Sequence, residues 1–156
     1  MINTREKIGN HDGLILLVED DLEDIYVLQR SIAKTKLNVA VEIAYNGQEA
    51  LAYLEDMAAS ERLSELSLIL LDLNMPLMDG HEFLRIIRAD KLFKIIPVVV
   101  LTTSQEQEVK ARAYSDGANA VISKADTLDG MMTIADTIVQ FWFKIARTSA
   151  YADRIK

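Results

Sequence analysis

The sequence predicts an α/β fold in which five parallel strands form one sheet with helices on both faces. Short apolar runs alternate five times with longer segments of helical character. Apolar runs of this length, bounded by turn residues, are typical of buried parallel strands. A right-handed connection through a helix joins each strand to the next, which places helices on both sides of the sheet. With 156 residues, half of them apolar, the chain is long enough for one compact domain.

The expected elements follow one another without internal repeats. Strands are predicted near 14–18, 39–44, 68–71, 98–101 and 120–122, and helices near 22–35, 47–59, 80–90, 106–117 and 128–147. Asn-Gly at 46–47 opens the second helix, and Asp-Gly at 79–80 opens the third. Gly117 closes the fourth helix, and Pro97 begins the fourth strand, where a missing N–H is tolerated. Residues 58–67 are interpreted as a helix end that runs into a polar loop.

Length and composition limit the possible functions. One domain is expected over 13–147, with tails at 1–12 and 148–156. The 24 acidic and 17 basic residues give a net charge of -7, which argues against nonspecific binding to nucleic acid or to anionic membranes. The absence of cysteine excludes disulfide, zinc-thiolate and thiol-nucleophile chemistry. No apolar run approaches the roughly 18 residues of a spanning helix, and the first residues lack the apolar stretch of a signal peptide, so a cytoplasmic protein is expected.

The last predicted helix has an unusually wide apolar surface. One face of it carries Met131, Ile134, Ala135, Ile138, Val139, Trp142, Ile145 and Ala146. Phe141 and Phe143 extend this face at its two edges, and the resulting arc of about 200° is twice what packing on a sheet requires. We therefore expect Phe141, Trp142 and Phe143 to form a homodimer interface through the C-terminal helices. The alternative is that the tail at 148–156 folds back over the helix.

Charged residues follow three of the predicted strands, at the point where each strand ends. Glu19, Asp20 and Asp21 follow the first strand, Asp72 follows the third, and Lys124 stands just past the last. The carboxyl ends of parallel strands lie at one edge of the sheet, where ligands bind in open α/β folds. A carboxylate cluster with one ammonium group is suited to a divalent cation and a phosphoryl group. The sequence therefore indicates such a site.

Purely structural explanations exist for each of these residues. Acidic side chains favour helix N-termini, and Asp21 is expected to cap the first helix. Helix capping does not need three acids in one place, so Glu19 and Asp20 are assigned to the site. Asp72 could be a turn residue, but the residues that follow it already supply the turn. Lys124 could be a solvated lysine, and only its spacing from the other segments argues otherwise.

Other polar residues are given supporting roles or none. Ser104 is expected to cap the fourth helix, and Thr103 to line the rim of the pocket. His11 and His81 stand in a polar tail and at a helix start, where exposure to solvent is expected, and neither is assigned a role.

Four segments of the chain resemble a known family. Residues 16–21 (LLVEDD), 70–80 (LLDLNMPLMDG), 100–104 (VLTTS) and 123–124 (SK) match, in order and spacing, the receiver domains of two-component response regulators. The resemblance extends from residue 13 to about 147. It implies a flavodoxin-like receiver fold with strand order 2-1-3-4-5. It also implies that Asp72 accepts a phosphoryl group from a sensor histidine kinase, and that the protein is a signalling module and not an enzyme with its own substrate.

The same resemblance implies the roles of the other site residues. Asp20 would bind Mg²⁺ directly, Glu19 would bind it through water, and the backbone carbonyl of Asn74 would supply a further ligand beside Asp72. Lys124 would pair with the free or phosphorylated carboxylate, and the Thr102 hydroxyl would bond to a phosphate oxygen. Mg²⁺ prefers such hard oxygen ligands and keeps several waters. The chemistry would consist mainly of positioning and electrostatic stabilisation.

The chain departs from the family at two positions. Ala125 follows Lys124 where most receivers have proline, so a cis peptide bond is not expected there. Val121 stands where many receivers have an aromatic residue that moves with the threonine. The segment 97–104 with the Phe141-Trp142 pair resembles the stand-alone receivers that partner bacterial phytochromes and form homodimers. That resemblance implies a light-sensing histidine kinase as phosphodonor, and no output domain or DNA binding is expected.

Two other classes of function use similar sheets. A phosphohydrolase with an aspartyl nucleophile usually has a second aspartate two residues later as general acid, where this chain has Asn74. A flavin-binding module needs a phosphate loop rich in serine, threonine and glycine after the first strand, and the acidic residues there would repel a flavin phosphate. The sequence therefore favours the phosphorylated signalling module.

Overall fold

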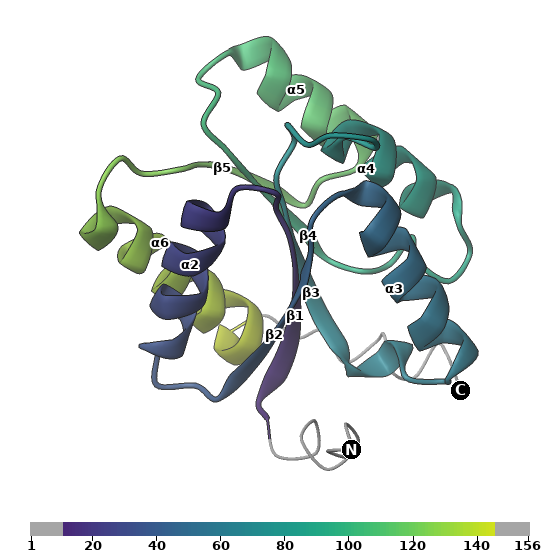
Figure 1. The fold of residues 1–156 in the computed structure, drawn as a ribbon, viewed down its shortest axis with the longest axis horizontal. Coiled ribbons are helices and arrows are strands. Elements are labelled where there is room, and N and C mark those ends of the chain that lie inside the picture. The colour runs from purple at the N-terminus through teal and green to yellow at the C-terminus, as the bar shows by residue number, and fades with distance from the viewer. Residues whose placement is uncertain (1–10, 146–156) are drawn as a thin grey trace.

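The chain folds as a five-stranded parallel sheet covered on both faces, as the sequence predicts. The structure is a computed structural model that describes residues 11–145, and Figure 1 shows its arrangement. The strands are β1 (Gly13–Val18), β2 (Val39–Ala44), β3 (Leu66–Leu71), β4 (Val98–Thr102) and β5 (Ala120–Ser123). They pair in the order β2-β1-β3-β4-β5, which confirms the predicted topology. β1 lies between β2 and β3, and the strand order reverses its direction at β1.

The helices lie in two groups, one on each face of the sheet (Figure 1). They are α2 (Leu22–Ala33), α3 (Gly47–Ala59), α4 (Gly80–Ala89), α5 (Gln107–Asp116) and α6 (Leu128–Gln140). Alternate side chains of β1 enter different cores: Leu16 packs with residues of α3 and α4, and Leu17 packs with residues of α2 and α6. Every residue of β1 from Leu14 to Val18 is at most 1% exposed. Burial on both faces explains why the strands are continuous apolar runs.

Side-chain caps define the starts of four helices. Asp21 accepts hydrogen bonds from the backbone N–H groups of the first turn of α2, as expected. Asn46, Asp79 and Thr127 cap α3, α4 and α6 in the same way. The expectation that Ser104 caps the next helix is wrong, because α5 begins after Glu106. The Ser104 hydroxyl instead accepts a hydrogen bond from the Glu106 N–H within the preceding loop.

The segment before β3 is more ordered than the predicted polar loop. A short 3₁₀ turn covers Leu63–Glu65, and β3 begins directly after it. Leu63 and Leu66 are each only 2% exposed and belong to the core beneath α3 and α4. The loop interpretation is wrong here because Leu63 and Leu66 anchor the segment in the core. The two polar residues between these leucines remain at the surface.

The last helix changes its geometry where its aromatic residues begin. From Phe141 to Ile145 the backbone is π-helical, so the predicted helix at 128–147 is α-helical only to Gln140, and residues 146–147 lie outside the described part. Trp142 and Phe143 pack partly against the core formed by α2 and α6. Phe141 is 48% exposed and forms a T-shaped ring pair with Trp142, with 5.2 Å between ring centroids. The tails assigned to 1–12 and 148–156 fall largely outside the described residues.

The backbone of β5, one of the two outer strands of the sheet, has a side-chain partner from a helix of the same chain. Among residues 11–145, β5 pairs with β4 alone, and the Val121 N–H donates to the hydroxyl of Tyr114 on α5 at 3.1 Å. The Val121 side chain is partly buried against the core beneath α3 and α4. Within residues 11–145, no helix has the length and apolar character needed to cross a membrane.

Candidate functional site

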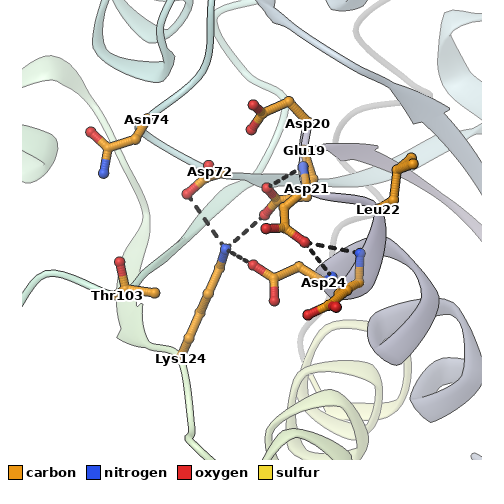
Figure 2. A pocket seen from close by; sticks show the side chains of 10 residues that line it. Glu19, Asp20, Asp21, Leu22, Asp24, Asp72, Asn74, Thr103 and Lys124 are labelled. Carbon is orange, nitrogen blue, oxygen red and sulfur yellow. Dashed lines mark hydrogen bonds and ion pairs between the residues drawn. The ribbon is translucent and has the colours of Figure 1, made fainter.

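The predicted site residues gather where β1 and β3 end. Val18 pairs with Leu71, so the residues that follow these strands emerge side by side. The Asp72 N–H donates to the Val18 carbonyl at 2.9 Å, which continues the alignment by one residue. Figure 2 shows the pocket that results. It is lined by Glu19, Asp20, Asp21, Leu22, Glu23, Asp24, Asp72, Asn74, Thr103 and Lys124.

Three carboxylates form the centre of this pocket. Glu19, Asp20 and Asp72 each offer an oxygen, and these oxygens all lie within 4.8 Å of one another. Glu19 and Asp72 are only 2% and 8% exposed, whereas Asp20 is exposed. Carboxylates so close together repel one another, and a divalent cation with hard oxygen ligands offsets that repulsion. The cluster therefore fits Mg²⁺ or a similar cation in number, type and spacing of donors.

Burial changes the ionisation of two of these carboxylates. Loss of solvent raises the pKa of Glu19 to about 7, although its hydrogen bond from Lys124 acts in the opposite direction. Burial likewise raises the pKa of Asp72, and the charge of Lys124 opposes it. A buried carboxylate without enough positive charge around it binds a proton more readily. In the metal-free protein the site therefore carries less negative charge near neutral pH than three free carboxylates would.

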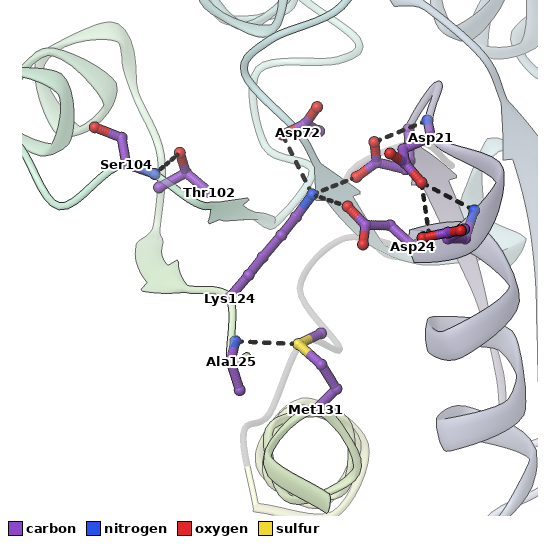
Figure 3. Close-up of polar contacts among 10 residues, drawn as sticks. Asp21, Asp24, Asp72, Thr102, Ser104, Lys124, Ala125 and Met131 are labelled. Atoms are coloured by element: carbon purple, nitrogen blue, oxygen red, sulfur yellow. Dashed lines mark hydrogen bonds and ion pairs between the residues drawn. The ribbon is translucent and has the colours of Figure 1, made fainter. Parts of the chain in front are cut away.

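Lys124 reaches into the cluster from the end of β5. Its Nζ lies 2.7 Å from Glu19 Oε2, 2.8 Å from Asp24 Oδ2 and 3.6 Å from Asp72 Oδ1 (Figure 3). The side chain is 7% exposed. Burial lowers the pKa of Lys124, but the hydrogen bonds to Asp24 and Glu19 outweigh it, so the pKa lies above its ordinary value. The ammonium therefore remains charged and links three acidic residues.

The backbone around Lys124 holds this position. The Lys124 N–H donates to the Thr102 carbonyl at 2.8 Å, which extends the pairing of β4 and β5. The Ala125 N–H lies 3.2 Å from Met131 Sδ in the first turn of α6 (Figure 3). Proline has no N–H and could not make this contact. Over residues 11–145 there is no cis peptide bond, in agreement with the expectation at Ala125.

A tight loop after β3 supports Asp72 from the other side. The Gly80 N–H donates to the Leu73 carbonyl at 3.0 Å, and a Cβ on Gly80 would collide with the Asp72 carbonyl oxygen. Only glycine permits this approach of α4 to the end of β3. Asn74 lies within the loop and lines the pocket. Its role as a metal ligand stays a prediction.

The two threonines after β4 have different positions. Thr102 is fully buried at the end of the strand, and its Oγ1 accepts a hydrogen bond from the Ser104 N–H at 3.1 Å (Figure 3). Thr103 is exposed and lines the pocket, as expected. The hydroxyl proton of Thr102 remains available for donation to another acceptor. Its assignment to a phosphate oxygen also stays a prediction.

The expectation of solvent exposure is wrong for His81. His81 is 8% exposed, and its Nδ1 lies 2.9 Å from Asp116 Oδ2 on α5. Arg85 and Arg112 approach the same carboxylate at 3.6 Å and 3.7 Å. His81 thus joins α4 to α5, a long-range contact that its place at a polar helix start does not reveal. His11 is half-buried.

Sequence reasoning also missed Asp24. This residue lies in the first turn of α2, three positions after the capping Asp21, and its carboxylate bonds to Lys124. The available signal was the helical spacing that places positions 21 and 24 on one side of the first turn. That signal alone does not distinguish a pocket residue from an ordinary N-terminal acid.

Comparison with known proteins identifies relatives over most of the chain. The family described as "Response regulator receiver domain" matches residues 15–136. The response regulator Rcp1 of the cyanobacterium Synechocystis sp. is 33% identical over 136 residues, which cover 87% of this chain and 92% of Rcp1.

Solved structures agree with this match. The phosphorylated cyanobacterial phytochrome response regulator RcpA has a TM-score of 0.79 and 37% identity, with 86% of this chain and 96% of that chain covered. The Mn²⁺-bound form of Rcp1 has a TM-score of 0.77 and 32% identity, with 86% of this chain and 97% of that chain covered. Both solved structures therefore share the fold of this chain over most of its length.

Proposed function

Because the chain belongs to the response regulator receiver family, we propose that Asp72 accepts a phosphoryl group from a sensor histidine kinase. The phosphorylated protein then signals through protein–protein contacts. Members of the family are signalling proteins and generally have no catalytic output. The observation that carries the proposal is the convergence of Glu19, Asp20, Asp72 and Lys124 in one pocket.

Asp72 is suited to be the phosphoryl acceptor. Its carboxylate is buried and lies 3.6 Å from Lys124 Nζ. This is close to the positive charge but beyond hydrogen-bond distance, so Lys124 does not occupy the Asp72 oxygens. In the proposed transfer, an Asp72 oxygen forms a bond to phosphorus while the P–N bond to the kinase imidazole breaks. The electron pair of that bond remains with the imidazole, which takes up a proton. The product is an aspartyl phosphate.

Glu19, Asp20 and Asp72 would hold a divalent cation, with the Asn74 carbonyl as a further ligand. When bound, Mg²⁺ supplies positive charge that offsets the repulsion between the carboxylates and the incoming phosphoryl oxygens. Lys124 adds a second positive charge beside Asp72. Thr102, at the end of β4, would donate its hydroxyl proton to a phosphoryl oxygen.

The kinase partner is proposed to be of the phytochrome type. The support is that RcpA, at 37% identity, is described as a cyanobacterial phytochrome response regulator. The aromatic segment after α6, with Phe141 exposed beside Trp142, supports the further proposal that the chain forms a homodimer. Both statements go beyond family membership and need their own tests.

The phosphoacceptor is tested with a small-molecule phosphodonor and Mg²⁺. We expect intact-protein mass spectrometry to show one added phosphoryl group on the unaltered chain and none on Asp72→Asn. The amide cannot form the acyl phosphate, while circular dichroism should show that the fold is kept. Asp136→Asn, which removes an exposed aspartate on α6, is the matched control and should be phosphorylated normally. An unaltered chain whose mass does not change would exclude Asp72 as the acceptor.

The partner is tested by timed transfer of label from histidine kinases. Phosphorylated phytochrome-type kinases and kinases of other classes are mixed separately with the purified chain. We expect transfer from a phytochrome-type kinase to be fastest, because docking surfaces set the rate of transfer between partners. Equal or faster transfer from an unrelated kinase would contradict the proposed partner while leaving the role of Asp72 intact.

A further inference from the structure

We propose that Asp24, in the first turn of α2, is a positioning residue that holds the Lys124 ammonium away from Asp72 until Asp72 is phosphorylated. The inference rests on the proposed function of Asp72 as phosphoryl acceptor. It adds a residue of α2 to the groups that control the reaction.

The distances around Lys124 show unequal bonding to three acids. Nζ is at hydrogen-bond distance from Glu19 at 2.7 Å and from Asp24 at 2.8 Å, but its separation from Asp72 is 3.6 Å. An ammonium has three protons to donate, and two are directed to these carboxylates. Figure 3 shows Lys124 extended between α2 and the end of β3. The ammonium thus lies beside Asp72 but does not form a hydrogen bond with it.

Burial distinguishes the two acids that hold the lysine. The Glu19 side chain is 2% exposed and depends on the positive charge of Lys124, whereas the Asp24 side chain is 39% exposed. A carboxylate that reaches solvent can replace a lost ion pair with water at little cost. The bond to Asp24 is therefore the one that Lys124 can exchange for a new partner.

Phosphorylation would supply that partner. A phosphoryl group adds negative charge and oxygen acceptors next to Nζ, at a distance that already approaches contact. Lys124 would then turn to the phosphoryl oxygen, keep its bond to buried Glu19 and release Asp24. The exchange connects the chemistry at Asp72 to the start of α2.

The release would act on a packed pair of helices. α2 and α6 share one core, in which Ile25 and Leu28 meet Met131 and Ala135. While Lys124 bonds to Asp24, the connection from β5 to α6 is tied to the first turn of α2. Loss of this bond removes that link, so Asp24 is placed to pass the state of the site to this helix pair.

The test compares two variants that each replace one aspartate by asparagine. Asp24→Asn removes the bond to Lys124, while Asp136→Asn removes an equal charge from an exposed position of α6 that does not line the pocket. With a small phosphodonor and saturating Mg²⁺, we expect Asp24→Asn to be phosphorylated about threefold faster than Asp136→Asn, as expected for loss of a partly exposed competing ion pair. Asp24→Glu, which can still reach Lys124, should restore the slower rate.

A metal-free measurement tests the contact independently of phosphorylation. In the presence of EDTA, the effect of Asp24→Asn on the folded-to-unfolded ratio should be about threefold more destabilising in the unaltered background than in Lys124→Met. Equal phosphorylation rates for Asp24→Asn and Asp136→Asn, or no coupling in this cycle, would overturn the positioning role. If the coupling is present but the unaltered chain is never phosphorylated, the proposed function fails, and the role that rests on it fails too.

Discussion

At the residue scale, Glu19 illustrates how one buried carboxylate couples the stability of the protein to its metal site. Burial raises the pKa of Glu19 from 4.5 to about 7, because the folded chain removes water that would solvate the charge. The folded state therefore binds a proton that the unfolded state has released in this range. In such a case stability decreases as pH rises between the unfolded and the folded pKa.

This sign gives a pH prediction for the metal-free protein. In EDTA, the Glu19 contribution to the free energy of unfolding should be fully present below about pH 4.5 and be lost as pH rises through about 7. From the difference between these two pKa values we expect a change of ~3 kcal/mol. Urea denaturation at a series of pH values measures it, and the difference from Glu19→Gln isolates Glu19 from other carboxylates. Parallel pH curves for the two proteins would contradict the prediction.

Metal binding should have the opposite dependence on pH. A carboxylate must lose its proton to serve as a ligand, directly or through water, so Mg²⁺ competes with the proton on Glu19. Below about pH 7 we expect the Mg²⁺ dissociation constant to rise as pH falls, by about tenfold per unit. Calorimetric or fluorescence titration with Mg²⁺ measures it. An affinity that does not change with pH across this range would show that Glu19 takes no part in binding.

The site residues differ in how far sequence alone could identify them. Glu19, Asp20 and Asp72 directly follow buried strands, and parallel pairing forces such positions together. Asp24 and His81 depend on the direction of a side chain from one helix toward another segment. That direction is set by tertiary packing and leaves no periodic trace in the sequence. Both therefore looked like ordinary residues of a helix N-terminus.

At the element scale, Arg88 joins the loops at the ends of α4 and α5. Its guanidinium donates to the carbonyls of Gly117, Lys94 and Ile96 and to Asn119 Oδ1. Gly117 has φ of +114°, a conformation that favours glycine, and a Cβ there would lie 2.6 Å from Arg88 Cγ. The end of α5 thus needs glycine at position 117 for two reasons: the left-handed backbone conformation and the close approach of the Arg88 side chain.

Gly117→Ala should consequently destabilise the protein. The methyl group would strain the left-handed backbone and displace Arg88 from its carbonyl partners, and we expect a loss of about 2 kcal/mol in the free energy of unfolding. Urea denaturation provides the measurement. Ser115→Ala, at an exposed position of the same helix, is the control and should change stability by less than about 0.5 kcal/mol. Equal midpoints for the two variants would disprove the steric argument.

Most strands and helices could be predicted because each has a clear period or a clear boundary residue. The start of β3 and the π-helical end of α6 could not. Leu63 and Leu66 are isolated apolar residues in a polar segment, and their burial depends on the core beneath α3. The change of helix type at Phe141 accompanies the packing of Trp142 and Phe143 against α2 and α6. In both cases long-range packing overrides the local pattern.

At the scale of the whole molecule, the aromatic segment after α6 governs the expected assembly. Trp142 and Phe143 are partly covered by the core of their own chain, and a Cβ on Gly13 would collide with the Phe143 ring. Phe141 is left as the most exposed of the three aromatic residues predicted for the interface. It is therefore the residue with which to test the proposed homodimer.

We expect light scattering at tens of micromolar to show a dimer for the unaltered chain. Phe141→Ser should weaken the dimer about tenfold, because an exposed aromatic ring near the centre of an interface contributes strongly to binding. Leu92→Ser is the matched control, since Leu92 is equally exposed at 48% but follows α4 on the other face of the sheet. A monomeric unaltered chain would favour the alternative in which residues 148–156 cover the helix.

The Tyr114 hydroxyl restricts the form that such a dimer can take. An outer β-strand whose amides are free can join the strand of another molecule and extend the sheet across both. In β5 the Val121 amide is already satisfied by a side chain of the same molecule. A partner strand would have to displace this bond before it could pair with Val121. The Tyr114 hydroxyl therefore disfavours extension of the sheet at this position and favours association through side chains, which needs no change in the backbone of β5.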